Sequence, residues 1–115
     1  MDLIGYEHAV TDEVTLLHTP GHTPGSVTVL VQSAGQSAMI LGDAAHHPAQ
    51  LTETDWTPII DIDRSLSARS RKAIVEEARR RDALIAGTHF NGPADPIFGR
   101  MIEIDGRPVW HGVDL

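Results

Sequence analysis

Three stretches of the sequence hold histidine or aspartate side chains in positions suited to binding a divalent metal. In residues 19–26, which read TPGHTPGS, His22 stands between two Pro-Gly pairs. Asp43 and His89 each come shortly after an apolar run that is followed by a glycine. Two imidazoles and a carboxylate suit zinc or another borderline divalent ion. Taken alone, residues 19–26 also fit a plain turn whose histidine faces water, whereas the ordered set of three favours a metal site.

The residues around His22 predict a rigid turn that holds this side chain in place. Two prolines and two glycines in residues 19–26 exclude a helix and the middle of a paired strand. The apolar runs 14–17 and 27–31 on either side predict two strands, with His22 at the apex between them. Because proline fixes its own φ and restricts the residue before it, the histidine is preset and loses little entropy on binding a metal.

Two buried strands are predicted to deliver the other two candidate ligands. Residues 38–41 and 83–86 are apolar, and they are followed by Gly-Asp and Gly-Thr-His respectively. Open α/β sheets place their sites at the carboxyl ends of strands. We therefore expect Asp43 and His89 to lie at one edge of the sheet.

The rest of the β pattern predicts a meander and a terminal hairpin. Residues 37–41 return antiparallel to the preceding strand after a short hairpin loop. Two further strands are predicted over residues 97–104 and 108–110. Asp105-Gly106 between them is a strong signal for a two-residue turn.

One clear helix is predicted over residues 65–81, on the outer face of the sheet. Three residues can cap its start, namely Asp63, Ser65 and Ser67. Its narrow apolar stripe consists of Leu66, Ala73, Ile74 and Ala78. The helix leads into the strand at 83–86 as a helix-to-strand unit of an α/β fold. Residues 1–11 carry little pattern.

The three motifs TPGHTPGS (19–26), LGD (41–43) and GTH (87–89) together resemble the C-terminal half of a metallo-β-lactamase-fold hydrolase. The resemblance covers residues 14–110 and implies a fold of the α/β (α+β) class. The implied architecture is half of an αββα sandwich, with a mostly antiparallel sheet and one outer helix. Residues 1–115 would then form a single domain.

The resemblance also implies a role for each candidate ligand. His22 would complete one metal site, Asp43 would bridge two metals, and His89 would bind the second metal. One or two zinc ions, or other divalent metals, would activate a water molecule that attacks an ester, lactone or phosphoester in a small-molecule substrate. Residues 42–48, which read GDAAHHP, are similar to the branch of the family that holds lactonases and organophosphate hydrolases.

The family's first metal motif, His-x-His-x-Asp-His, is absent from this sequence. The remaining histidines lack that spacing, namely His8, His18, His46, His47 and His111. The chain therefore holds half of a site, and we expect it to bind zinc weakly and to be inactive alone. Half a sandwich leaves one apolar sheet face uncovered, which predicts a homodimer, a complex with a separate N-terminal half, or poor solubility. The alternative is a non-catalytic binding or assembly module that is a remnant of the fold.

The loop after Asp43 is expected to form one wall of the substrate pocket. His46 lies three residues beyond this aspartate, within reach of the metals or the substrate, and hydrogen bonding within the loop is its alternative role. His47 precedes a proline and is expected to be extended. Trp56 is interpreted as a loop anchor that can also contact the substrate. Phe90, next to His89, either lines the pocket or packs in the core.

Composition narrows the classes of function further. The net charge of -7 argues against general nucleic-acid binding. Seven of the nine basic residues lie in residues 64–81, which favours the solvated side of a surface helix over an anion- or RNA-binding face. The absence of cysteine excludes thiolate ligands and fits a cytoplasmic protein. No apolar run approaches the about 20 residues needed to cross a membrane, and a secretory signal is not expected.

Overall fold

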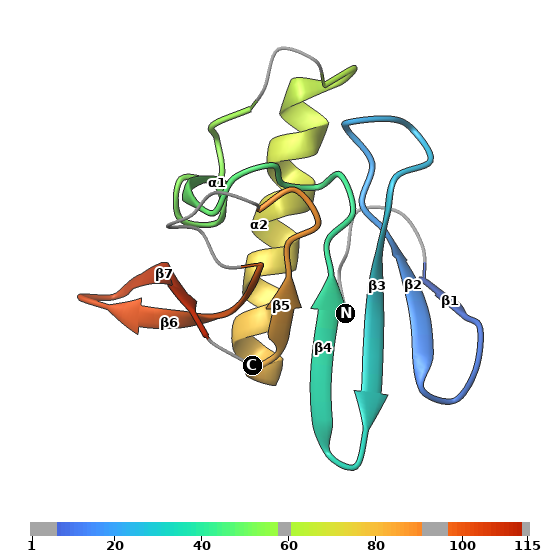
Figure 1. Cartoon of the computed structure of the whole chain (residues 1–115). Helices are drawn as coiled ribbons and strands as arrows, with labels where there is room; N and C mark the ends of the chain where they lie inside the picture. The colour runs from blue at the N-terminus through green and yellow to red at the C-terminus, as the bar shows by residue number, and fades with distance from the viewer. Residues whose placement is uncertain (1–6, 58–60, 91–96, 114–115) are drawn as a thin grey trace.

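A sheet whose strands follow one another in chain order forms the centre of the fold (Figure 1). The computed structural model describes residues 7–57, 61–90 and 97–113. The strands are β1 (Glu7–Ala9), β2 (Val14–His18), β3 (Val27–Ser33), β4 (Gln36–Ile40), β5 (Leu84–Ala86), β6 (Phe98–Ile104) and β7 (Arg107–Gly112). The helices are α1 (Ala49–Thr52) and α2 (Arg64–Arg81). All neighbouring strands pair antiparallel except β4 and β5, which are parallel.

This architecture confirms the predicted fold class, a mostly antiparallel sheet with an outer helix. The meander β2–β3–β4, the terminal hairpin and the strand that follows α2 all form as expected. Asp105 and Gly106 have φ values of 51° and 77°, the left-handed pair that a tight hairpin turn requires. Strand β1 has no apolar pattern that could predict it, because its three residues are all exposed, and it pairs with β2.

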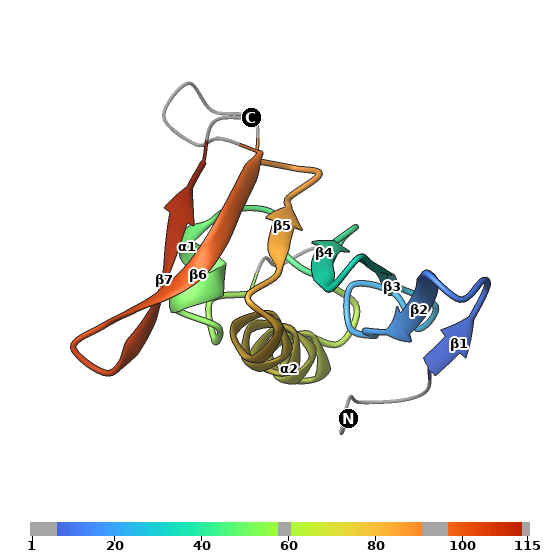
Figure 2. The same cartoon turned by 90° about the horizontal axis from the view of Figure 1, so that it is seen from below.

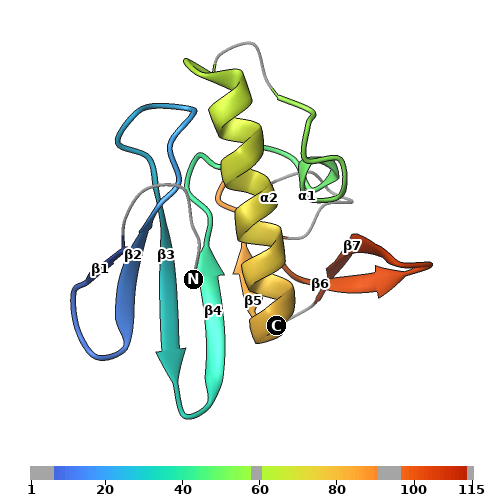
Figure 3. The ribbon, with the colours of Figure 1, turned by 180° about the vertical axis from the view of Figure 1, so that it is seen from behind.

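The core lies between the sheet and α2, which crosses one face of the sheet (Figure 3). Leu30, Met39 and Ile85 are cross-strand neighbours on that face, and each is almost fully buried. Ile74 and Ala78 of α2 complete the cluster. Removing such apolar surface from water is the main force that holds the helix to the sheet. Neither helix in the described ranges is long and apolar enough to span a lipid bilayer.

The opposite face of the sheet carries two rows of apolar side chains that run across four strands. One row is Leu16, Val29, Ile40 and Ala86. The other row is Val14, Val31, Ala38 and Leu84. All eight residues keep contact with solvent, and Ile40 is 39% exposed. Both helices of the described chain lie away from these rows (Figure 2), so the apolar face expected from the sequence is present.

Helix α2 begins at the expected cap, but its predicted apolar stripe is only half correct. The side chain of Asp63 accepts a hydrogen bond of 3.0 Å from the backbone N–H of Leu66, as an N-cap should. Leu66 itself is only partly buried. The inner positions of the first turns are polar instead, namely Ser67, Ser70 and Arg71. These side chains bind the loops that carry the candidate ligands, which is why polar residues are buried there.

The start of α2 also clamps the turn that carries His22. Ser70 Oγ donates a hydrogen bond of 2.7 Å to the carbonyl of Pro20, and the N–H of Asp63 donates one of 2.8 Å to the carbonyl of Gly21. Gly21 has a φ of 141°, and a Cβ at this position would collide with the backbone of Ser67. Glycine is therefore required here both for its backbone conformation and for the close approach of the helix.

We expect Gly21→Ala to lower the free energy of unfolding by more than about 2 kcal/mol, because it adds backbone strain and a clash with α2. Urea unfolding followed by circular dichroism measures this change. Gly25→Ala is the matched control in the same turn, since a Cβ at Gly25 meets no atom within 4 Å. The control should stay within about 1 kcal/mol of the parent chain. Equal effects of the two substitutions would contradict the clamp.

Candidate metal centre

Two loops that leave the parallel strands β4 and β5 bring Asp43 and His89 together. The N–H of Leu41 donates a hydrogen bond of 3.1 Å to the carbonyl of Ala86, which extends the pairing to the ends of both strands. Thr88 Oγ1 then donates one of 3.0 Å to the carbonyl of Gly42. Beyond this tie, His89 Nε2 and Asp43 Oδ1 are 2.7 Å apart. The carboxyl ends of parallel strands thus form the expected edge.

The turn between β2 and β3 places His22 at the same edge. His22 Nε2 lies 4.0 Å from Asp43 Oδ2, the carboxylate oxygen that does not contact His89. His18 Nε2 is 2.7 Å from the carbonyl oxygen of Pro24, and this contact braces the turn from below. The structure therefore brings together the three ligands proposed from the sequence. His22 and His89 lie beside the two carboxylate oxygens of Asp43.

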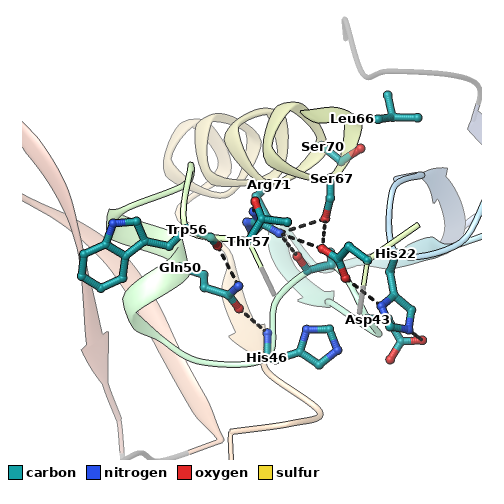
Figure 4. A network of polar contacts seen from close by, with 12 residues as sticks. His22, Asp43, His46, Gln50, Trp56, Thr57, Leu66, Ser67, Ser70 and Arg71 are labelled. Carbon is teal, nitrogen blue, oxygen red and sulfur yellow. Dashed lines mark hydrogen bonds and ion pairs between the residues drawn. The ribbon is translucent and has the colours of Figure 1, made fainter. Parts of the chain in front are cut away.

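His46 lies among these side chains as a third imidazole. Its ring centroid is 5.1 Å from that of His22 and 4.6 Å from that of His89, and it stacks on the latter ring. The ligand atoms of His22, Asp43 and His46 all lie within 4.8 Å of one another. Gln50 Oε1 fixes the loop by accepting a hydrogen bond of 2.6 Å from the backbone N–H of His46 (Figure 4).

The electrostatics of the cluster keep both Asp43 and His46 in the unprotonated form. The hydrogen bond from His89 lowers the pKa of Asp43, and the nearby imidazoles add to this effect against a smaller opposing one from burial. Burial lowers the pKa of His46, and the neighbouring His89 and His22 lower it further. Metal ligands must be unprotonated, so these shifts favour metal binding.

The donor set fits zinc. Imidazole nitrogens and a carboxylate are among its ordinary ligands, and His22, Asp43 and His46 offer them from two loops. His46 Nδ1 is buried and makes no hydrogen bond within the described residues. A buried polar atom without a partner is costly, and a metal ion or a bound polar group would satisfy it. In this structure His22, Asp43 and His46 form the set that could hold a metal ion, and His89 adjoins it through Asp43 Oδ1.

A second layer of polar groups lies behind His22, and no motif in the sequence predicts it. His22 Nδ1 is 2.8 Å from Asp61 Oδ1, and the Asp61 side chain is fully buried. Ser67 Oγ donates a hydrogen bond of 2.6 Å to Asp61 Oδ2. Arg71 Nη1 lies 3.7 Å from the same oxygen. A hydrogen-bonded carboxylate behind a histidine is the usual second shell of a metal ligand.

Arg71 is a buried cation that makes four hydrogen bonds among the residues that the structure describes. Its Nη1 donates to Ser67 Oγ at 2.9 Å and to the carbonyl of Ala44 at 3.3 Å. Its Nε donates to the carbonyl of Thr54 at 3.1 Å, and its Nη2 donates to Thr57 Oγ1 at 2.5 Å. The basic residues of 64–81 are predicted from the sequence to lie on a solvated helix face. For Arg71 this prediction is wrong, because its side chain is buried. Positions 67, 70, 71 and 74 share one helix face, and that spacing was the available signal.

The proposed substrate residues separate into two groups. Trp56 is 61% exposed and borders a cavity of about 410 Å³ together with His46, His47, Ala49, Gln50 and Thr57. His46 belongs both to the lining of this cavity and to the cluster around Asp43. Phe90 is only 1% exposed and contacts Trp110 edge-on in the core, with ring centroids 5.3 Å apart. The expectation that Phe90 lines the pocket is therefore corrected in favour of core packing.

Comparisons with known proteins identify the fold. No family model matches the sequence, and no curated protein matches it significantly. The hydrolase AbOPH of the beta lactamase superfamily is 22% identical with a TM-score of 0.78, and the match covers 91% of this chain and 36% of that one. AidC, a dizinc quorum-quenching lactonase, is 21% identical with a TM-score of 0.78, over 100% of this chain and 37% of that one.

A probable metal-dependent hydrolase from Staphylococcus aureus is 16% identical with a TM-score of 0.73, and the match covers 99% of this chain and 41% of that one. These neighbours confirm the resemblance predicted from the motifs, because all three are hydrolases with the fold of the metallo-β-lactamase superfamily. The chain thus has this fold, and it spans less than half the length of the structures it matches.

The lowered pKa of His46 predicts how stability depends on pH in the metal-free protein. The unfolded chain takes up a proton on His46 near its ordinary pKa of about 6.5, whereas the folded chain does so at lower pH. Between these values the unfolded state binds more protons, so the free energy of unfolding falls as the pH is lowered. We expect His46→Gln to reduce this loss between about pH 7.5 and about pH 5, measured by urea unfolding. An unchanged pH slope would contradict the prediction.

Proposed function

We propose that this chain supplies half of the active centre of a metal-dependent hydrolase. The observation that carries the proposal is the convergence of His22, Asp43, His46 and His89 at the carboxyl edge of β4 and β5. The fold supports it, because the structural neighbours are hydrolases, and two of them are described as dizinc or metal-dependent. The metal is proposed to be zinc, as one or two ions.

The chemistry follows from the ligand types. A bound divalent metal lowers the pKa of a water ligand and polarises a carbonyl or phosphoryl oxygen. Asp43 presents Oδ1 towards His89 and Oδ2 towards His22, so its two oxygens are placed to serve two metals. His46 is neutral at the same edge and can exchange a hydrogen bond or a proton with a substrate oxygen. We propose an ester, lactone or phosphoester substrate, whose remaining part occupies the cavity beside Trp56.

The proposed centre needs further ligands from another polypeptide segment. One catalytic zinc ion usually has three protein ligands. If His22, Asp43 and His89 are divided between two metals, each metal has fewer than that. The two apolar rows on the face opposite α2 offer a surface on which a second sheet can pack. We propose that this segment is the N-terminal half with the His-x-His-x-Asp-His motif, or that a homodimer completes the site.

A non-catalytic binding or assembly module is the second candidate. The absence of the His-x-His-x-Asp-His motif from these 115 residues and the apolar sheet face both favour it. The retained cluster of three histidines and a carboxylate favours the hydrolase, because an assembly module needs no such set. Metal binding separates the two candidates.

We expect His22→Ala and Asp43→Ala each to weaken zinc binding by about tenfold or more, since each removes a ligand. Competition with a chromophoric chelator measures the affinity. His111→Ala is the control, because this histidine is exposed on β7, away from the cluster. Equal zinc affinity in all four proteins would reject the proposed centre and favour the assembly module.

We expect the oligomeric state and the metal content to change together. Light scattering and metal mass spectrometry on the same sample should give one or two zinc ions per chain only when a defined oligomer or complex forms. Hydrolysis of lactones and phosphotriesters should be little or none for the chain alone. A monodisperse monomer with full hydrolytic activity would contradict the need for a second segment.

A further inference from the structure

We propose that Asp61 is the positioning residue that fixes the tautomer and orientation of His22, and that Arg71 and Ser67 in turn fix Asp61. The inference rests on the proposed function insofar as His22 is to bind a metal. The tautomer that it assigns belongs to the metal-free chain, so it can be tested separately. Asp61, Ser67 and Arg71 lie outside the three motifs TPGHTPGS, LGD and GTH.

The contact between His22 and Asp61 determines which ring nitrogen carries the proton. A carboxylate only accepts hydrogen bonds, so the 2.8 Å contact requires the proton on Nδ1 of His22. The lone pair of the neutral ring is then on Nε2. This nitrogen is the one that lies 4.0 Å from Asp43 Oδ2, on the side of the candidate metal centre. The geometry therefore presents the ligand atom in the form that can bind a metal.

Asp61 is itself held from the other side, so it cannot turn away from His22. Its Oδ2 accepts the 2.6 Å hydrogen bond from Ser67 and faces the Arg71 guanidinium at 3.7 Å. The next residue, Ile62, donates its backbone N–H to the carbonyl of His22 at 3.2 Å. Main chain and side chain thus tie the same two segments together. Both charged side chains are buried, with Arg71 1% and Asp61 0% exposed.

The same network reaches the loop that carries Asp43. Arg71 donates to the carbonyl of Ala44, the residue after this aspartate, and to the carbonyl of Thr54 farther along the loop. Arg71 therefore anchors the loop of Asp43 to helix α2 directly, and it is linked to the turn of His22 through Asp61. A plain structural ion pair would need only Asp61 and Arg71, and it would make no demand on the His22 ring. The direct contact from Asp61 to His22 is what assigns a positioning role.

Substituting Asp61→Asn tests this role sharply, because the amide has one accepting and one donating end. Ser67 donates to Oδ2 of Asp61, and the Arg71 cation lies 3.7 Å from the same oxygen, so the amide oxygen should face them. The amide NH₂ should then face His22 and require a lone pair on Nδ1. The proton of His22 should move to Nε2, the wrong tautomer for a ligand on that side.

The first measurement is the ¹⁵N NMR tautomer signature of His22 in the metal-free chain at about pH 8, where a neutral imidazole is observed. We expect a protonated Nδ1 in the parent chain and a protonated Nε2 in Asp61→Asn. Asp63→Asn is the matched control, because it makes the same change two residues away at a helix cap that asparagine also satisfies. A parent chain with the proton on Nε2 would overturn the proposal, even if the variant failed to fold.

The second measurement is the zinc affinity of the same three proteins, together with their unfolding midpoints. Loss of a second-shell partner typically weakens metal binding by about 10- to 100-fold, and we expect this loss in Asp61→Asn but not in Asp63→Asn. A folded Asp61→Asn chain with the zinc affinity of the parent would overturn the positioning role. If the parent chain binds no zinc even within a defined oligomer or complex, the proposed function fails, and the tautomer measurement still decides the role of Asp61.

Discussion

The buried ion pair between Arg71 and Asp61 is the interaction on which the arrangement of the site depends. Two charges in an apolar interior are tolerated only when they are paired and fully hydrogen-bonded, and removing one partner of such a pair typically costs about 3–5 kcal/mol. Here Arg71 makes three hydrogen bonds to the loop of residues 44–57, and Asp61 accepts one from His22. The same contacts therefore stabilise the start of helix α2 and fix the geometry of the site.

The topology of the sheet is the second feature that the site depends on, because it places Asp43 and His89 side by side. In a sheet of antiparallel hairpins, successive connections lie at opposite ends of the strands, and ligand loops are seldom adjacent. The parallel pair β4–β5 is the exception, because α2 carries the chain back across one face before β5 begins. Asp43 and His89 thus leave the sheet side by side, 46 residues apart in the sequence. His22 joins them because the preceding hairpin ends at the same edge.

Much of this arrangement is visible in the sequence, because it is encoded locally. Proline and glycine mark the turn around His22, and a short apolar run marks each strand that leads to Asp43 or His89. The contact between His22 and Asp61 joins residues 39 apart, and no local pattern reports it. Phe90 could not be placed from the sequence, since its neighbour Trp110 comes from a distant strand. Leu66 was assigned to the wrong face of α2 because the buried positions at the start of this helix are serines and an arginine. A search for apolar residues does not find such a face.

The order of the strands has a consequence for how the chain folds. Every antiparallel pair joins strands that are adjacent in the sequence, so each hairpin closes a short loop. The pair β4–β5 alone must close over residues 41–83, which carries the largest entropic cost of any strand pairing in this sheet. The hairpins can form from local contacts, whereas the edge that gathers Asp43 and His89 exists only after this long-range closure. Formation of the candidate metal centre would therefore mark the stage of folding at which β4 and β5 have paired.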